Sequence, residues 1–236
     1  ADQVTFIAYN SGTNTLTSAD VAATAENTVT PSTSLNTDKK TATLDMYSVM
    51  IPIYDEAKLS NADDIASNVG GLVGNAMAAK ADGLLNALFD GFSNAVGANN
   101  AALTVDNLFD ALSSLKQNAA IGQPSAVLDP RQIWGTYGVH NDLVTAAQFA
   151  GSGVQEEGAR NGFVSQIAGI GIHSSSEFTV ASSAVKGGVF VPGALGMGYA
   201  GEMIKTEVYR EGSYLRDNII GSGFWGVTEI IDGWGV

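Results

Sequence analysis

The residues with the most recognisable chemistry in this sequence are three glycines near the C-terminus. Gly196, Gly198 and Gly201 form the spacing G-x-G-x-x-G within GMGYAG, which binds a dinucleotide pyrophosphate where a strand leads into the N-terminus of a helix. The strand-like residues 188–191 precede the glycines, but a second strand-like segment, 203–210, follows where that binding fold needs a helix. We therefore interpret the glycines as a turn or loop. A nucleotide-binding enzyme that uses the loop from Gly196 to Gly201 stays as an alternative hypothesis.

Two other spacings have simple structural explanations. Ser113 and Lys116 have the S-x-x-K spacing in which a lysine activates a serine in some hydrolases. Both fall late in an amphipathic helix pattern, where a lysine suits the helix dipole. His140 and His173 are the two histidines of the chain, and neither has a second histidine or an acid at metal-ligand spacing. We expect surface or loop positions for both histidines.

One acidic pair completes the candidates for catalysis. Glu156 and Glu157 have the residue types of a general acid and base, but they lie in a glycine-rich polar segment, 151–162. A solvated loop explains this segment without any chemistry. The sequence therefore predicts no catalytic residue, no cofactor and no metal site, and hence a protein that is not an enzyme.

The composition limits the partners of the chain. Its 236 residues include 11 Lys and Arg against 24 Asp and Glu, and the net charge of −13 argues against a basic face that binds nucleic acid. There is no Cys, which excludes disulfides and thiolate chemistry. No apolar run approaches the ~20 residues of a membrane-spanning helix, so we expect no membrane partner. With 45% hydrophobic residues, the chain has enough apolar side chains for a substantial core.

The predicted elements are organised around one long amphipathic helix at residues 60–92, the spine helix. Its apolar positions recur mostly every three or four residues: Ile65, Val69, Leu72, Val73, Ala76, Met77, Leu84, Leu85, Leu88 and Phe89. Its predicted polar face contains Asn68, Asn75, Asp82 and Asn86. Ser60, with Asp63 at the reciprocal position, is the predicted N-cap. Lys80 falls on the apolar face, where it either extends to water or pairs with an acid of another segment or subunit.

Four glycines within the spine helix predict a close packing partner. Gly70, Gly71, Gly74 and Gly83 would each cost about 1 kcal/mol relative to alanine inside a helix, or about 3 to 4 kcal/mol together. We expect another segment to approach the helix at these residues and to offset that cost.

The first 54 residues predict an arm and a hairpin. Residues 1–40 are rich in Thr, Ser, Asn and Ala, which is typical of an extended arm that gains order by lying on another surface. Alternation at 41–54 predicts one long strand, and its pairing with 27–30 across the polar tip 31–40 would make a protruding hairpin. Because ordering an isolated arm and hairpin costs conformational entropy, we expect both to be buried only against other copies of the chain.

The rest of the chain combines helices in the middle with strands toward the end. One helix is predicted to start at the cap Thr104, a second at Asp129 and Pro130, and a third at 141–150. Strands are predicted at 125–128, 163–167, 170–174, 188–191, 203–210 and 224–232. In 203–210 the alternation predicts a half-buried strand with Val208 on its buried face. This segregation of helices and strands favours an α+β fold.

This order of elements resembles the major capsid protein of tailed bacteriophages, which has the Hong Kong 97 phage capsid fold. The resemblance covers essentially the whole chain, and two segments carry it locally. Residues 51–92 are similar to that family's entry into its spine helix. SAVLDPRQIWGTYG at 125–138 is similar to the family's hydrophobic strand, turn with proline, basic residue and helix.

The resemblance implies a division of the chain into an arm, a loop and two domains. Residues 1–26 would form the N-terminal arm, and 27–53 an extended hairpin loop that lies across a neighbouring subunit. Residues 54–103 and 197–236 would form a peripheral domain with the spine helix, and 104–196 an axial domain.

The resemblance also implies a structural function. The chain would self-assemble through hexamers and pentamers into an icosahedral shell that encloses double-stranded DNA without binding it specifically. It would belong to the virion after assembly in the host cytoplasm, with many copies of itself and scaffold, portal or cement proteins as partners. The candidate contacts between subunits are Lys39, Lys40, Tyr47, Tyr54 and Lys80. An encapsulin-type nanocompartment shell, which encloses protein cargo, is the alternative within the same fold.

Overall fold

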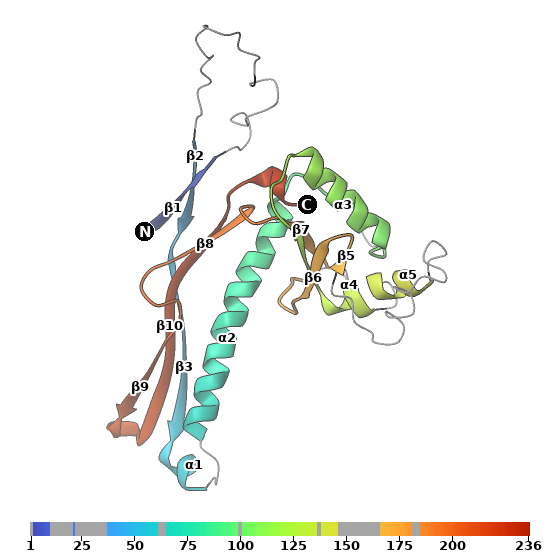
Figure 1. The fold of residues 1–236 in the computed structure, drawn as a ribbon. Coiled ribbons are helices and arrows are strands. Elements are labelled where there is room, and N and C mark those ends of the chain that lie inside the picture. The colour runs from blue at the N-terminus through green and yellow to red at the C-terminus, as the bar shows by residue number, and fades with distance from the viewer. Residues whose placement is uncertain are drawn as a thin grey trace, which may run out of the picture.

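The computed structural model describes residues 2–9, 21, 37–60, 65–98, 101–135, 138–145, 166–180 and 185–236. They form an elongated body with a long sheet and one long helix, a compact lobe beside its upper end, and a two-stranded ribbon that leaves the body (Figure 1). Helices concentrate in the middle of the chain and strands at both ends, so the predicted α+β class is confirmed.

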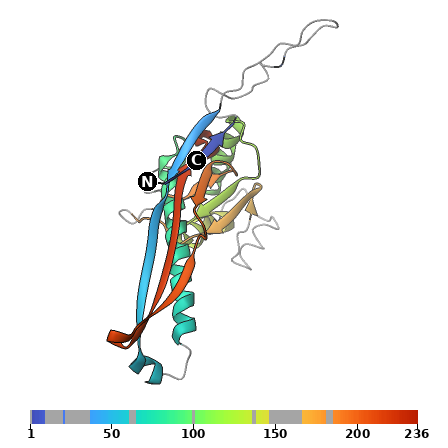
Figure 2. The ribbon, with the colours of Figure 1, turned by 90° about the vertical axis from the view of Figure 1, so that its left-hand side faces the viewer.

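The long sheet is antiparallel and has β10 (Arg216–Glu229) at its centre. Strand β3 (Asp45–Tyr54) pairs with one edge of β10 along its length. At the other edge, β8 (Leu195–Tyr199) and β9 (Lys205–Glu211) pair with successive parts of β10. The helix α2 (Ile65–Ala87) runs along one face of this sheet. In Figure 2 the sheet lies in front of the helix.

The helix and the sheet meet through two small apolar clusters. Val73 of α2 packs on Ile53 and Ile219, and Met77 with Ala81 packs against the buried Trp225. The closest approach falls on a glycine of the strand, because a Cβ at Gly221 would lie under 3.0 Å from Cγ1 of Val73. The expected close contact at the helix glycines is wrong for most of them. An added Cβ at Gly70, Gly71 or Gly74 meets nothing within 4 Å, and only at Gly83 is there an ordinary contact, with Glu177.

The spine helix is confirmed, with corrections to its start and to its faces. Ser60 ends a separate short helix, α1 (Asp55–Ser60), and its hydroxyl donates to the carbonyl of Ala57 instead of capping α2. Its predicted partner Asp63 lies outside the described residues. After Ala87 the chain tightens into a 3₁₀ turn, Leu88–Gly91.

The predicted faces of the spine helix are wrong at three positions. Leu72 and Ala76, expected on the apolar face, are exposed. Asn86, expected on the polar face, is buried and its amide donates to the hydroxyl of Ser175 and the carbonyl of Glu177. The last turns of α2 therefore face the lobe as well as the sheet, so a single stripe cannot describe what the helix buries.

The ribbon consists of β1 (Gln3–Ala8) and β2 (Asp38–Thr43), paired antiparallel. The predicted strand at 41–54 is broken at Leu44, where β2 ends and β3 begins, and β3 pairs with β10. The predicted partner of this strand, residues 27–30, lies outside the described residues. Residues 3–8 also correct the idea of an arm buried only on other copies, because Ala8 and its partner strand's Ala42 are buried within the chain itself.

The compact lobe has its own core beneath a second sheet. It contains α3 (Val105–Gln117), β4 (Ser125–Leu128), α4 (Pro130–Trp134), α5 (Val139–Thr145), β5 (Gln166–Ile167), β6 (Ile170–Ser174) and β7 (Gly188–Phe190). The strand order is β5-β6-β4-β7, with β4 and β6 parallel. Leu108, Leu115 and Ile133 are among the fully buried side chains of this core. The C-terminal residue Val236 pairs by backbone hydrogen bonds with Val189 of β7 and so closes the lobe.

Both predicted helix caps in the lobe are confirmed. The hydroxyl of Thr104 accepts from the backbone N–H of Asn107, and the Asn107 side chain accepts in turn from the N–H of Thr104. The carboxylate of Asp129 accepts from the N–H of Arg131, with Pro130 at the first helical position. Such reciprocal caps satisfy backbone donors that a helix start leaves open.

The last strands differ from their predictions in length and burial. Strand β10 begins at Arg216, eight residues before the predicted 224, and short 3₁₀ turns follow β9 at Gly212–Tyr214 and β10 at Asp232–Trp234. Val208 of β9, expected on a buried face, is 65% exposed. All residues of β9 from Lys205 to Arg210 are exposed, so both faces of this strand lie open.

Candidate assembly surface

The face of the long sheet that turns away from α2 carries exposed apolar side chains. Along β3, Tyr47, Val49, Ile51 and Ile53 pack toward the helix, and the alternate residues point away from it. Among those alternate residues, Met46 is 63% exposed and Met50 is 55% exposed. No helix among the described residues covers this face (Figure 2).

The same face continues onto β10 through the strand register. Phe224 pairs with Met46, and Ile220 pairs with Met50. Phe224 is 45% exposed, although it lies in the central strand of the sheet. Met46, Met50, Ile220 and Phe224 thus form one apolar stripe across two neighbouring strands, the outer stripe.

A hollow adjoins the outer stripe. It has a volume of about 400 Å³ and is lined by Phe224 with Ala200, Glu202, Lys205, Ser222 and Gly223. Contiguous exposed apolar surface beside a hollow, rimmed by polar side chains, is typical of a protein–protein contact. The outer stripe is therefore a candidate surface for assembly, and a small-molecule site needs a more enclosed pocket.

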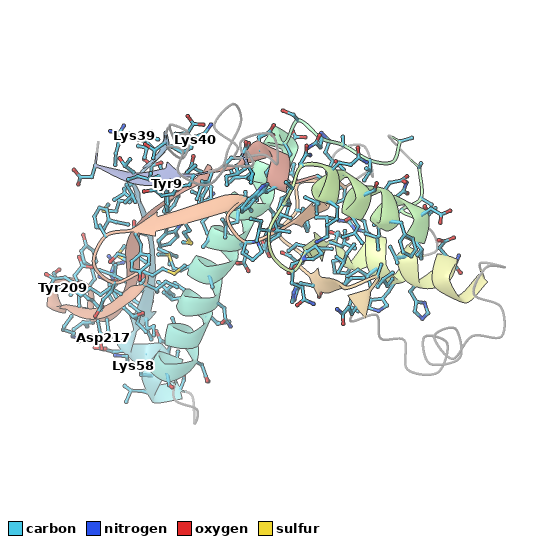
Figure 3. The ribbon with its side chains drawn as sticks, turned by 45° about the horizontal axis from the view of Figure 1, so that its top comes forward. Tyr9, Lys39, Lys40, Lys58, Tyr209 and Asp217 are labelled. Carbon is cyan, nitrogen blue, oxygen red and sulfur yellow. The ribbon has the colours of Figure 1, made fainter. Side chains whose placement is uncertain are left out.

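The ribbon offers a second exposed surface. Ile7 and Tyr9 are exposed beside Lys39, the register partner of Ile7. In Figure 3, Tyr9, Lys39 and Lys40 lie together at the ribbon end of the molecule, and Lys58, Tyr209 and Asp217 lie at the opposite end of the long sheet. Both exposed surfaces, the ribbon and the outer stripe, are therefore candidates for contacts with other copies of the chain.

The structure places the candidate contact residues in three settings. Lys39 and Lys40 are exposed on the ribbon. Tyr47 stacks on Trp225 with ring centroids 4.7 Å apart, and Lys80 lies with its Nζ 5.8 Å from the Tyr47 ring, so these residues contact each other. Burial, followed by the charge of Asp45, raises the pKa of Tyr47. Tyr54 is half exposed, and the guanidinium of Arg216 lies 6.0 Å from its ring.

Ion pairs fix the far end of the long sheet. Arg210 donates two hydrogen bonds of 2.6 Å to the carboxylate of Asp55 and one of 3.1 Å to Asp217, which also pairs with Lys58. The hydrogen bonds from Arg210 lower the pKa of Asp55, and those from Lys58 and Arg210 lower the pKa of Asp217. Helix α1, which buries none of its residues, is held to β9 and β10 by these charges.

The residues singled out for chemistry are not assembled into a site. The turn or loop interpretation is wrong for Gly196 and Gly198, which lie inside the antiparallel strand β8, and it holds only for Gly201. The residues after Gly201 lead into strand β9 and not into the helix that a dinucleotide site needs. His173 is exposed on β6. In the described part of the chain, no group of three or more His, Asp or Glu side chains could hold a metal ion.

The structure does not bring the remaining catalytic candidates together among the described residues. Ser113 lies on α3 and its hydroxyl accepts from the side chain of Gln117, 3.0 Å away, one turn further along. His140 lies in α5. Glu156 and Glu157 lie outside the described residues. Among the helices that the structure describes, none has the length and apolar content needed to cross a bilayer.

Sequence reasoning missed the outer stripe. Its signal is present in 45–54, where Met46 and Met50 alternate with Tyr47, Val49 and Ile51. Both sets are apolar, however, and the alternation alone does not say which set faces the helix. The answer depends on the register with β10, which the local pattern does not contain.

Comparison with known proteins gives a clear result at the level of fold. No protein-family model and no curated protein matches the sequence. Among solved structures, the chain is similar over its whole length to a protein of Mycobacterium phage Che8, with a TM-score of 0.72, 14% identity and coverage of 84% of that chain. It is also similar to a capsid chain of cyanophage P-SCSP1u, with a TM-score of 0.69, 18% identity, and coverage of 100% of this chain and 82% of that one.

A third solved structure extends the comparison beyond phages. A chain of the holo-SrpI encapsulin complex from Synechococcus elongatus PCC 7942 matches 86% of this chain and 76% of its own length, with a TM-score of 0.57 and 13% identity. Together these similarities confirm the fold that the order of elements resembles, the Hong Kong 97 phage capsid fold.

Proposed function

We propose that the chain is the major capsid protein of a tailed phage, a structural protein without enzymatic activity. It self-assembles into an icosahedral shell that encloses double-stranded DNA and is part of the virion after assembly in the host cytoplasm. The observation that carries this proposal is the whole-chain similarity to solved phage capsid proteins, which is higher than the similarity to the encapsulin. The exposed outer stripe and the ribbon supply surfaces for contacts between copies.

The elongated body and the compact lobe would be the two domains of such a protein. The long sheet with α2, from 54–103 and 197–236, serves as the peripheral domain, joined by β3. The lobe within 104–196 serves as the axial domain, which meets its copies at five-fold and six-fold axes in pentamers and hexamers. The extended loop is the ribbon β1–β2, so it begins earlier in the chain than the 27–53 expected from sequence, and it includes the first strand of the expected arm at 1–26.

The contact between copies joins the ribbon of one subunit to the outer stripe of the next. Ile7 and Tyr9 supply apolar side chains from the ribbon, and Lys39 and Lys40 supply positive charge. Tyr54, at the far end of the sheet, lies beside the stripe on the accepting subunit. Tyr47 and Lys80, which contact each other inside the chain, support the sheet beneath that contact.

The other partners of the shell are the DNA that it encloses and accessory proteins. A net charge of −13 keeps the inner wall from holding DNA tightly, so the genome is enclosed without specific binding. Scaffold, portal or cement proteins are the further partners of a shell of this kind.

Imaging of the purified chain tests the proposal. We expect the chain, expressed alone or with its scaffold, to form closed shells in negative-stain electron microscopy. In Met50→Glu, each contact would bury a carboxylate against apolar side chains, so shells should be lost while the circular dichroism of the subunit stays unchanged. The matched control Met50→Leu keeps the apolar surface and should assemble. Shell formation by Met50→Glu at the native yield would remove the outer stripe from the contact.

An encapsulin-type nanocompartment is the second candidate, and the similarity to the Synechococcus elongatus encapsulin complex favours it. The contents of purified particles separate the two. Nuclease-resistant double-stranded DNA supports the capsid, and a stoichiometric protein cargo without DNA supports the nanocompartment.

A further inference from the structure

The glycine pattern near the C-terminus has a structural use that a turn alone does not explain. Gly196 and Gly198 point the same way along β8, and Gly198 is the register partner of Gly226 on β10. All three are buried. Gly226 lies two residues from Phe224, so these glycines occupy the same face of the sheet as the outer stripe, at its upper end. We call Gly196, Gly198 and Gly226 the glycine seat.

The ribbon occupies the glycine seat from above. A Cβ added at Gly198 would lie 2.7 Å from Cβ of Val4 and within 2.9 Å of both its methyl groups. A Cβ at Gly196 would lie 3.2 Å from the Phe6 ring and 2.6 Å from Ile230. Alternate residues of β1, Val4 and Phe6, thus rest where the sheet has no side chains.

The second strand of the ribbon touches the seat through its backbone. A Cβ at Gly226 would lie under 3.0 Å from the carbonyl oxygen of Thr43, at the point where the chain passes from β2 to β3. Ala42, next to Thr43, is 1% exposed. The base of the ribbon is therefore fitted to the sheet at both of its strands.

The ribbon is joined to the body at Leu44, where β2 leads into β3, and by this packing, without a shared ladder among the described strands. β1 and β2 form a two-stranded sheet of their own, and neither is paired with a strand of the long sheet. A two-stranded ribbon is marginally stable alone, so its position depends on what it packs against. Without a ladder to fix its direction, the fit of Val4 and Phe6 on the glycines sets the angle at which the ribbon leaves the body.

We propose that the glycine seat is a positioning element for assembly: it fixes the angle of the ribbon, and this angle decides whether the ribbon reaches the outer stripe of the next subunit. This proposal rests on the proposed function, since it concerns the same contact. On this proposal, a side chain at Gly196 or Gly198 would lift β1 from the sheet, so the spacing serves packing and not a nucleotide.

The ribbon angle can be measured directly on the unassembled chain. The chain contains no Cys, so Lys39→Cys on the ribbon and Thr206→Cys on β9 give two unique spin-label sites for a pulsed electron paramagnetic resonance distance. We expect Gly198→Ala to shift or broaden this distance, and Val4→Gly in the same chain to restore it by removing all side-chain atoms that the new Cβ meets. Gly171→Ala, a strand glycine whose added Cβ has only ordinary contacts from 3.6 Å, is the matched control and should change nothing.

Assembly is the second readout. The yield of native-sized shells should fall about tenfold or more in Gly198→Ala and recover in Gly198→Ala with Val4→Gly, since overpacking is relieved. An unchanged distance in Gly198→Ala, or a shifted distance with native assembly, would overturn the proposal. Where Gly198→Ala fails to fold by circular dichroism, Phe6→Ala is measured instead, since it removes the ring that rests on Gly196: a broadened distance supports the seat, and a native distance overturns it.

The two readouts separate this proposal from the proposed function. The label distance needs no shell, so it tests the seat even in a chain that never assembles. Absence of shells from the native chain under every assembly condition would count against the capsid function, whatever the label distance shows.

Discussion

The contact between Gly221 of β10 and Val73 of α2 offers the sharpest test of how the helix packs on the sheet. Gly221→Ala would place a methyl group under 3.0 Å from Cγ1 of Val73. Val73 is 0% exposed and lies between Ile53 and Ile219, so its side chain has no solvent to move into. Overpacking of this kind lowers the free energy of unfolding by about 1 to 3 kcal/mol. Replacing glycine also reduces the conformational entropy of the unfolded chain, which raises the free energy of unfolding by about 0.4 to 1 kcal/mol. We expect a net loss of about 1 to 2 kcal/mol.

The reciprocal substitution supplies the second side of a double-mutant cycle. Val73→Ala removes two buried methyl groups at about 0.8 kcal/mol each and leaves a cavity, for a loss of about 2 kcal/mol. Additive effects would destabilise the double variant by about 3 to 4 kcal/mol. If the methyl of Gly221→Ala fills the space that Val73→Ala vacates, the two changes should be coupled favourably by about 1 to 2 kcal/mol.

Urea unfolding of the unassembled chain, followed by tryptophan fluorescence, measures this coupling. Trp225 is fully buried and stacked on Tyr47 above the same helix, so its emission reports on the helix–sheet packing. Gly71→Ala is the control, because its Cβ meets nothing within 4 Å and should stabilise the helix by up to about 1 kcal/mol. Strict additivity in the cycle would refute the close approach of α2 to β10 at Gly221.

Three further predictions concern single positions in the lobe and at its junction with α2. Asp129→Ala removes the cap of α4 and should cost about 1 to 2 kcal/mol in urea unfolding, whereas Asp129→Ser keeps a capping oxygen and should lose less. Hydrogen bonds from Arg131 lower the pKa of Asp129, so its stabilisation is complete above the unfolded-state pKa of about 4 and is lost as pH falls through the lower folded-state pKa. Native stability should therefore decline more steeply than that of Asp129→Ser across this acid range, and parallel curves would contradict the assignment. Asn86→Ala removes the amide that bonds to Ser175, 2.9 Å away, and should cost about 1 to 2 kcal/mol. If Asn86→Ala leaves the free energy of unfolding unchanged, the hydrogen bond from Asn86 to Ser175 does not hold the helix to the lobe.

The helices and their starts could be predicted from sequence because their signals are local. The four-residue spacing of Val69, Val73 and Met77 defines a helix within its own 23 residues. The caps at Thr104 and Asp129 depend on residues two or three positions away. Fold class and the order of elements follow from such signals, and the similarity to phage capsid structures confirms the resemblance drawn from that order.

The pairing of strands could not be predicted, because the partner of β3 lies more than 150 residues away in β10. Nothing within 41–54 distinguishes that partner from 27–30, and a local hairpin is the default when sequence distance is all that is known. The break at Leu44 was also hidden, since its backbone N–H bonds to the carbonyl of Asp2, which lies opposite Leu44 beside β1 and 42 residues earlier in the chain.

The packing roles of the glycines could not be predicted from the local sequence either. Those of the spine helix stand out by their cost in a helix, yet Gly70, Gly71 and Gly74 have open space beside them. Close approach occurs instead at strand glycines, among them Gly221 under the helix and Gly226 under the ribbon. A glycine's packing role depends on which segment crosses it, and that is a property of the fold.

Electron cryomicroscopy of particles formed by the purified chain tests the central claim most directly. The account predicts closed icosahedral shells built from pentamers and hexamers, in which the ribbon of each subunit lies on the outer stripe of its neighbour. Subunits that stay monomeric under every assembly condition, or shells in which Met46, Met50 and Phe224 face solvent with no neighbour on them, would contradict it.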